Sequence, residues 1–318
     1  MQQTEKGLEQ VSVTQKKSRN MKKYLIHLFI LPSLLLYSMF QVYPIISALM
    51  NSFYSFQGFA RDTFIGLDNF KMLFTQSPFK ETFYNALHHN WIYFVVTFFS
   101  KIVVSFLLAL LIHSKIKGKE FFKTVFFLPR MLSIIVVGYL FSLILNPTSG
   151  ALNSFLDLVG LGSLAQPWLG STTTALYTII LVDSWNSIGF SMLIFLAALQ
   201  GVDKEIYEAA KIDGAKIVTQ ILKITIPMVM PAIMIVTILT FISSFETFEL
   251  IYALQGSTGG PFYSTDVLGT YFYRLIFGSI EGGQSIGLGS AVVVVLFLII
   301  ASVSALSLIL FRKKDFER

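Results

Sequence analysis

The chain has 318 residues, of which 54% are apolar and only 13% are charged, with 31 phenylalanines and no cysteine. This composition excludes an ordinary water-soluble domain, and the lack of cysteine excludes disulfides, thiol catalysis and thiolate metal sites. The net charge of +6 comes from basic residues at the borders of apolar runs, so it indicates membrane topology rather than a nucleic-acid partner.

Six apolar runs are long enough to cross a bilayer, which takes about 20 residues each. They lie near 24–49, 88–113, 124–145, 173–199, 226–254 and 285–311. The sequence therefore predicts an all-α polytopic membrane protein with six transmembrane helices. We expect an N-terminal tail at 1–23, a transmembrane domain at 24–311 and a C-terminal tail at 312–318. The first run is too long for the core of a cleavable signal peptide.

Basic residues set the predicted orientation. They gather before the first run, between the second and third, between the fourth and fifth, and after the sixth: Lys16, Lys17, Arg19, Lys22, Lys23; Lys115, Lys117, Lys119, Lys123; Lys204, Lys211, Lys216, Lys223; Arg312, Lys313, Lys314, Arg318. The opposite connections carry only Arg61, Lys71, Lys80 and Arg274. The positive-inside rule then places both tails and the connection at about 200–225 in the cytoplasm.

Two basic residues fall inside the predicted spans. Lys101 lies near the middle of the second span, where it could pair with Asp183, Glu246 or Glu249. Arg130 lies near the cytoplasmic end of the third span, where a long side chain can snorkel to the interface. The sequence does not decide between a cavity role and simple pairing for either residue.

Polar residues recur at helical spacing in the fourth and fifth spans. In each span they fall at i, i+3, i+4 and i+7, which is one helix face: Asp183, Asn186, Ser187 and Phe190, then Thr240, Ser243, Ser244 and Thr247. Glu246 and Glu249 lie beside the second face. Carboxylates, amides and hydroxyls can pair with sugar hydroxyls, and aromatic rings can cover a sugar's C–H face. We expect a cavity here, although Ser and Thr also serve in membrane helices as glue between helices.

A polar segment between the fourth and fifth spans reads Glu208-Ala209-Ala210-Lys211-Ile212-Asp213-Gly214 and is followed by Ile224-Thr225-Ile226-Pro227. The first six residues suit a helix, and glycine commonly ends one. Such a helix in a cytoplasmic loop can dock a partner, or it can lie on lipid headgroups.

Several reactive arrangements are missing from the sequence. The chain has no Gly-x-x-x-x-Gly-Lys-Ser/Thr loop for phosphates, so any ATP must be bound by a partner subunit. His27, His88, His89 and His113 have no metal-ligand spacing with carboxylates, and no catalytic Ser/His/Asp set can be argued. We therefore expect no catalytic residue, no metal site and no enzymatic activity.

A series of short motifs runs along the chain: Gly66-Leu67-Asp68-Asn69-Phe70, Asn85-Ala86-Leu87, Phe126-Phe127-Leu128-Pro129, Asn146-Pro147 through Gly150 and Asn153, Trp168-Leu169, Trp185, Glu208 to Gly214, Ile224 to Pro227, and Thr258 to Pro261. In this order, the motifs resemble those of the carbohydrate permeases of bacterial ABC importers, the maltose-type, binding-protein-dependent group in its compact six-span form. The resemblance covers roughly 24–311.

This resemblance implies a type I ABC importer permease fold in the bacterial cytoplasmic (inner) membrane. It implies four further subunits or partners: a second homologous permease, two ATPase subunits that hold ATP and Mg, and an extracytoplasmic sugar-binding protein. No cofactor is expected on this chain itself. The resemblance assigns ATPase coupling to Glu208, Ala209, Ala210, Asp213 and Gly214. It assigns the sugar pocket to the two polar faces, with Glu246 added from its place beside the second.

The expected function is import of a sugar, an uncharged oligosaccharide, since three intramembrane acids face one mid-span lysine. Two alternatives stay open. One is a permease for another solute, such as an anionic or phosphorylated sugar, a polyol or a peptide. The other is an ion-coupled secondary carrier that uses Asp183, Glu246 or Glu249.

Overall fold

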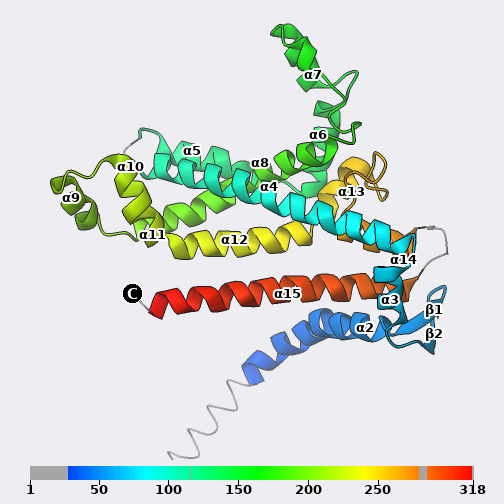
Figure 1. The fold of residues 1–318 in the computed structure, drawn as a ribbon. Coiled ribbons are helices and arrows are strands. Elements are labelled where there is room, and N and C mark those ends of the chain that lie inside the picture. The colour runs from blue at the N-terminus through cyan, green and yellow to red at the C-terminus, as the bar shows by residue number, and fades with distance from the viewer. Residues whose placement is uncertain (1–27, 115, 279–284, 317–318) are drawn as a thin grey trace, which may run out of the picture. The chain divides into compact units, whose positions relative to one another are not determined.

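The computed structural model describes residues 28–114, 116–278 and 285–316, and Figure 1 shows that helices dominate them. The chain divides into two units, Met1–Asn51 and Ser52–Arg318. The predicted N-terminal tail at 1–23 and the first four residues of the first predicted span lie outside the described residues, as do residues 317–318 of the C-terminal tail.

The first unit is a single apolar helix, Leu28–Asn51, which includes the π-helical turn η1 (Ser38–Val42) and α2 (Tyr43–Asn51). Its apolar side chains are exposed on all sides; Phe29, for example, is 88% exposed within the chain. A helix that is apolar all round suits a lipid environment. It is long and apolar enough to cross a membrane, in agreement with the first predicted span.

Two long, continuous helices form the centre of the second unit. They are α4 (Phe79–His113) and α8 (Ala175–Gln200), which pack along each other. Hydroxyls join them, because Ser105 donates to the Ile188 carbonyl at 3.0 Å. Gly189 lets α8 approach the Phe126 backbone, where a Cβ atom would collide with the carbonyl. Small and hydroxyl side chains of this kind are typical of helix contacts in membranes.

Two further helices complete the bundle. They are α12 (Met230–Phe245), which packs on α4, and α15 (Ile286–Phe316), which packs on α12 and α14 (Leu268–Phe277).

The third and fifth predicted spans are bent rather than straight. In the third, α5 (Lys119–Phe127) and the 3-10 turn η2 (Leu128–Met131) meet α6 (Ile134–Ile144) at 96°. In the fifth, α10 (Ile217–Gln220), the π turn η4 (Ile221–Thr225) and α11 (Ile226–Met228) meet α12 at 68°. Prolines lack the N–H that continues a helix, and one lies in or beside each bend, at Pro129 and at Pro227.

Among the described residues, four helices are long and apolar enough to cross a membrane, or six if each bent pair is one span. The predicted run at 226–254 is also interrupted on its other side. There α12 ends at Phe245, and α13 (Glu249–Gln255) begins only after Glu246-Thr247-Phe248. The helical face predicted through Thr247 therefore stops before it.

The end of the second unit away from α9 (Lys204–Ile212) carries short elements (Figure 1). These are the antiparallel hairpin of β1 (Tyr54–Gln57) and β2 (Ala60–Phe64), and α3 (Asp68–Thr75). The hairpin is a small departure from the all-α prediction. Asn69 anchors it by donating to the Ser52 and Tyr54 carbonyls at 2.8 and 3.0 Å. The connection to α8 holds α7 (Ala151–Leu158) and the turn η3 (Gly162–Leu164).

Candidate functional site

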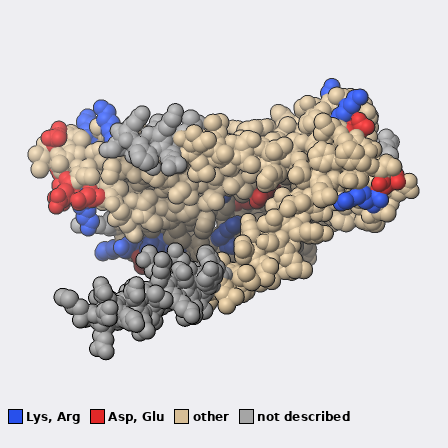
Figure 2. Space-filling view, turned by 90° about the horizontal axis from the view of Figure 1, so that it is seen from below, with Lys and Arg blue, Asp and Glu red and all other residues tan. Residues whose placement is uncertain are grey.

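Charged side chains are distributed unevenly over the surface. On the face drawn in Figure 2, Lys, Arg, Asp and Glu gather toward the ends, and most of the surface between them is uncharged. This distribution fits a protein whose middle lies in hydrocarbon, where charges are costly. Charged residues away from the ends are therefore candidates for function.

A cavity of about 240 Å³ lies among α4, η2, α8 and α12, and we call it the interhelix cavity. It is lined by Lys101, Arg130, Ser187, Phe190, Ser191, Ile194, Val236, Leu239, Thr240, Ile242, Ser243 and Glu246. Hydroxyls, a carboxylate, two cationic groups and an aromatic ring thus surround one space. Such a mixture of a few polar groups on apolar walls is typical of small-molecule sites.

The structure brings the two predicted polar faces together, although only in part. Five of the nine predicted pocket residues line the interhelix cavity: Ser187, Phe190, Thr240, Ser243 and Glu246. Asp183, Asn186, Ser244 and Thr247 are not among its lining residues. Glu246 reaches the cavity from the turn that follows α12, where helix spacing no longer applies.

Asn186 and Ser244 have structural contacts. Asn186 is 1% exposed, donates to the Pro129 carbonyl at 2.7 Å and accepts from Arg130 Nη1 at 3.3 Å. The Ser244 carbonyl accepts from Asn90 Nδ2 at 2.9 Å. Asn186 therefore holds the bend at η2 against α8, and Ser244 joins α12 to α4.

Lys101 and Arg130 supply the positive charge of the interhelix cavity. Lys101 is 8% exposed, and no carboxylate of the described residues lies within 4 Å of its ammonium. It interacts electrostatically with Asp183 at longer range. The sequence left both cations undecided, and the structure places both on the cavity. Of the three acids Asp183, Glu246 and Glu249, only Glu246 lines the cavity. The number of acids in the predicted spans therefore did not predict the charge of the cavity.

The polar segment after α8 forms a helical hairpin, Asp203 to Thr225, which we call the α9 hairpin. Asp203 caps α9 by accepting from the Glu205 N–H at 3.1 Å. The helix ends at Ile212, and Gly214 follows with a φ of +75°. The Ala215 N–H then donates to the Ala210 carbonyl at 2.9 Å, a C-terminal capping bond that requires this left-handed residue. The predicted helix with a glycine stop is confirmed.

Two further contacts close the α9 hairpin. Gln220 Nε2 donates to the Ala215 carbonyl at 2.7 Å, and the hydroxyls of Tyr207 and Thr225 lie 3.1 Å apart. Of the residues predicted to couple to an ATPase, Glu208, Ala209, Asp213 and Gly214 are exposed, while Ala210 is 9% exposed. Ile212 is 87% exposed beside them. The hairpin thus presents acids and an apolar side chain outward on a locally fixed turn.

The chain is similar in sequence to known components of transport systems. Residues 101–315 match the family described as "Binding-protein-dependent transport system inner membrane component". The chain is 35% identical over 289 residues to the arabinooligosaccharides transport system permease protein AraP of Bacillus subtilis, covering 90% of this chain and 88% of AraP. It is 34% identical over 253 residues to the lactose transport system permease protein LacF of Rhizobium radiobacter, covering 79% and 82%.

A solved structure shares the fold. It is a chain of a bacterial ABC transporter involved in the import of the acidic polysaccharide alginate, with a TM-score of 0.75 and 22% identity. The match covers 92% of this chain and 96% of that chain. The helical arrangement described above is therefore that of an ABC transporter's membrane subunit.

Proposed function

Because the chain belongs to the family of binding-protein-dependent transport system inner membrane components, we propose that it is a permease subunit of an ATP-driven sugar importer. Relatives that match between 79% and 92% of this chain are named for transport of arabinooligosaccharides, lactose or multiple sugars. The chain is a multi-pass membrane protein of a transport family and not an enzyme.

The observation that carries the proposal is the interhelix cavity. It combines Glu246, the hydroxyls of Ser187, Thr240 and Ser243, and the Phe190 ring, from two different helices and the turn after one of them. Sugar hydroxyls can donate to the carboxylate and exchange hydrogen bonds with the hydroxyls, while the ring covers apolar C–H groups. The cavity of this subunit, at about 240 Å³, has room for part of an oligosaccharide, and a paired permease would supply the opposite wall.

The α9 hairpin is the proposed point of coupling to an ATPase. The chain has no phosphate-binding loop, so ATP and Mg belong to two partner ATPase subunits. The hairpin lies between the end of α8 and the start of α11, and its movement is transmitted to the helices that line the cavity. ATP binding then turns the cavity toward the binding protein outside, and hydrolysis resets it. In this orientation both termini and the hairpin lie in the cytoplasm of a bacterial cell.

The substrate that we propose first is an uncharged oligosaccharide, in line with the relatives named for neutral sugars. A second candidate, an anionic sugar, is favoured by one observation. Lys101 and Arg130 line the same cavity as Glu246, which leaves the described site with two cationic groups and one acid. A sugar carboxylate could pair with the Arg130 guanidinium in the bidentate manner typical of arginine.

The experiment is ATPase stimulation of the purified complex by binding protein loaded with either sugar. Neutral arabino-oligosaccharide should stimulate hydrolysis, and galacturonate oligosaccharide of equal length should not. The reverse pattern, abolished by Arg130→Gln, would establish the second candidate. Transport by this chain alone, driven by an ion gradient, would instead overturn the importer and favour a secondary carrier.

A further inference from the structure

A second and larger cavity, of about 710 Å³, lies at the base of the α9 hairpin and shares no lining residue with the interhelix cavity. Its walls come from the last turns of α4 and α8, from α9 and from the segment α10–η4. We call it the apolar slot. Its lining residues are Leu107, Leu110, Leu111, His113, Ser114, Leu199, Tyr207, Lys211, Ile217, Gln220, Ile221 and Thr225.

The walls of the slot are mostly apolar side chains. Its leucines and isoleucines include several that no other part of the described unit covers, since Leu107 is 54%, Leu111 58% and Ile217 74% exposed. The polar groups on its inner side already have partners within the hairpin. Tyr207 and Thr225 bond each other, and Gln220 donates to Ala215. The interior of the slot therefore has room for an apolar chain, and its polar side chains need no hydrogen bond from a ligand.

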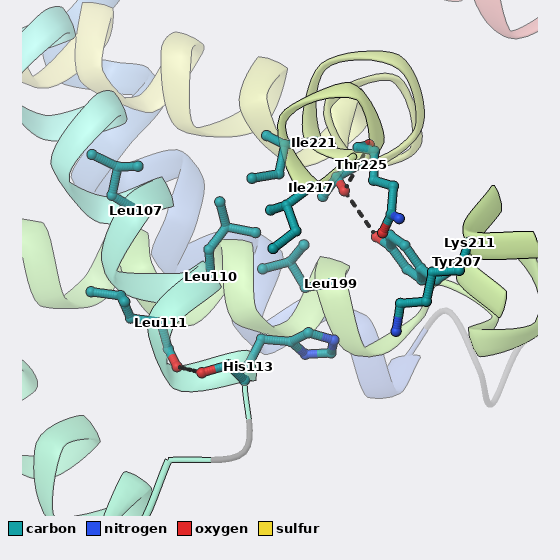
Figure 3. A pocket seen from close by; sticks show the side chains of 12 residues that line it. Leu107, Leu110, Leu111, His113, Leu199, Tyr207, Lys211, Ile217, Ile221 and Thr225 are labelled. Carbon is teal, nitrogen blue, oxygen red and sulfur yellow. Dashed lines mark hydrogen bonds between the residues drawn. The ribbon is translucent and has the colours of Figure 1, made fainter. Parts of the chain in front are cut away.

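One edge of the slot carries the ammonium of Lys211 and the imidazole of His113. Figure 3 shows the His113 ring and the Lys211 side chain at the same edge, with the leucines and isoleucines toward the upper left of the view. Both are exposed, and neither has a hydrogen bond or ion pair within the described residues. Lys216 and Lys117 are exposed on the connections that follow Lys211 and His113, and the exposed acids Glu208 and Asp213 lie close to Lys211 in the sequence.

We propose that the apolar slot binds an anionic phospholipid of the cytoplasmic leaflet, with one acyl chain in the slot and its phosphate at Lys211 and His113. Basic pockets between helices on the cytoplasmic side of a membrane are suited to anionic headgroups. This lipid site rests on the membrane orientation given under the proposed function and is independent of which sugar is carried.

The consequence concerns coupling. Tyr207 and Lys211 belong to α9, whereas Leu107, Leu111 and His113 belong to α4. A lipid that fills the slot therefore contacts both the coupling hairpin and the helix that carries Lys101. It would add to the packing of Tyr207 on the core cluster that includes Ala109 and Ile112 of α4, so that anionic lipid sets how closely the hairpin follows the transmembrane helices.

The direct test is photolabelling of the intact complex in membranes, using phosphatidylglycerol with a diazirine in one acyl chain. Label should enter the peptides 107–114 and 217–225. A phosphatidylcholine probe with the same chains should label these peptides about fivefold less, which corresponds to about 1 kcal/mol per basic side chain at an anionic surface. Lys211→Gln should reduce phosphatidylglycerol labelling by a similar factor.

The matched control is Lys119→Gln, which removes an exposed charge at the start of α5 without touching the slot. It should leave labelling unchanged. Equal labelling by the two probes, or labelling that Lys211→Gln does not reduce, would overturn the proposal.

A competing occupant is a helix of the paired permease. The chain has no cysteine, so Leu111→Cys gives a single thiol for disulfide mapping against cysteines placed in that partner. Efficient cross-linking to the partner, without lipid label, would also overturn the lipid assignment. Because labelling is measured whether or not sugar moves, its failure is distinct from failure of the importer function.

Discussion

The α9 hairpin and the interhelix cavity differ in how far along the chain their contacts reach. The bonds that shape the hairpin join residues at most 18 positions apart, the longest being Tyr207 to Thr225. Those that shape the cavity wall join Asn186 to Arg130 and Pro129, 56 and 57 positions apart, and Asn90 to Ser244, 154 positions apart. The hairpin can form locally, whereas the cavity exists only after several helices have docked.

This difference suggests that the two regions respond differently to single substitutions. The hairpin presents exposed side chains on a fixed turn, so single changes there should remove docking without unfolding the bundle. In the cavity, several polar groups together bind the sugar, so single changes there should each reduce transport only in part.

Glu208→Ala should reduce sugar uptake by roughly thirtyfold or more, because Glu208 is an exposed acid on the proposed ATPase contact and such anchors often dominate an interface. The amount of protein in the membrane should not change. Glu205→Ala, an exposed acid three residues earlier on the same helix, is the control and should retain most uptake. Uptake in whole cells and immunoblotting of membranes measure both quantities, and near-normal uptake by Glu208→Ala would remove the docking assignment.

Gly214→Val should reduce uptake by about tenfold. The glycine has a φ of +75° and open space around it, so the cost is backbone strain of about 1–3 kcal/mol rather than a clash. Gly214→Asn is the matched control, since asparagine tolerates the left-handed region. Uptake assays should rank wild type and Asn above Val, and equal activity of Val and Asn would show that the turn is not needed.

Glu246→Ala should weaken transport by about tenfold, since a hydrogen bond to a charged group contributes about 1.5–3 kcal/mol. Glu246→Gln keeps the shape and one acceptor, so it should lose about threefold. Glu249→Ala removes a neighbouring exposed acid that does not line the cavity and should change little. Initial uptake rates at several sugar concentrations measure the series, and a larger loss at Glu249 than at Glu246 would contradict the cavity.

Cysteines placed at two adjacent serines should differ in their rate of thiol labelling, although each substitution should have little effect on transport. Ser243→Cys should react with a water-soluble maleimide and be protected by substrate, because Ser243 lines the cavity. Ser244→Cys should react at least about tenfold more slowly, because the residue is 1% exposed and burial limits thiol reactivity. The native chain offers no competing cysteine. Equal rates at the two positions would mean that α12 is oriented differently.

Features encoded by neighbouring residues were predictable from the sequence. The helix over Glu208–Ile212 and its stop at Gly214 follow from local propensity, and the apolar runs follow from composition. The spacing of Ser187 and Phe190, and of Thr240 and Ser243, also placed those side chains on the correct faces.

Features that depend on distant segments were not predictable. Arg130 reaches the cavity from η2, just before the 96° bend to α6, and no local pattern gives the direction of that bend. The end of α12 at Phe245 removed Thr247 from the expected face, while Glu246 entered the cavity from the turn. The apolar slot could not be recognised at all, because its leucines on α4 and its lysine on α9 are about 100 residues apart and each reads as an ordinary membrane-border residue.

The central claim is that this chain moves sugar only when an ATPase drives the α9 hairpin. The complex that copurifies with the full-length chain should be reconstituted in liposomes with sugar-loaded binding protein on the side opposite the hairpin. We predict uptake that requires ATP on the hairpin side and that Glu208→Ala reduces by roughly thirtyfold or more. Uptake without ATP, sustained by an ion gradient and unaffected by Glu208→Ala, would contradict the account.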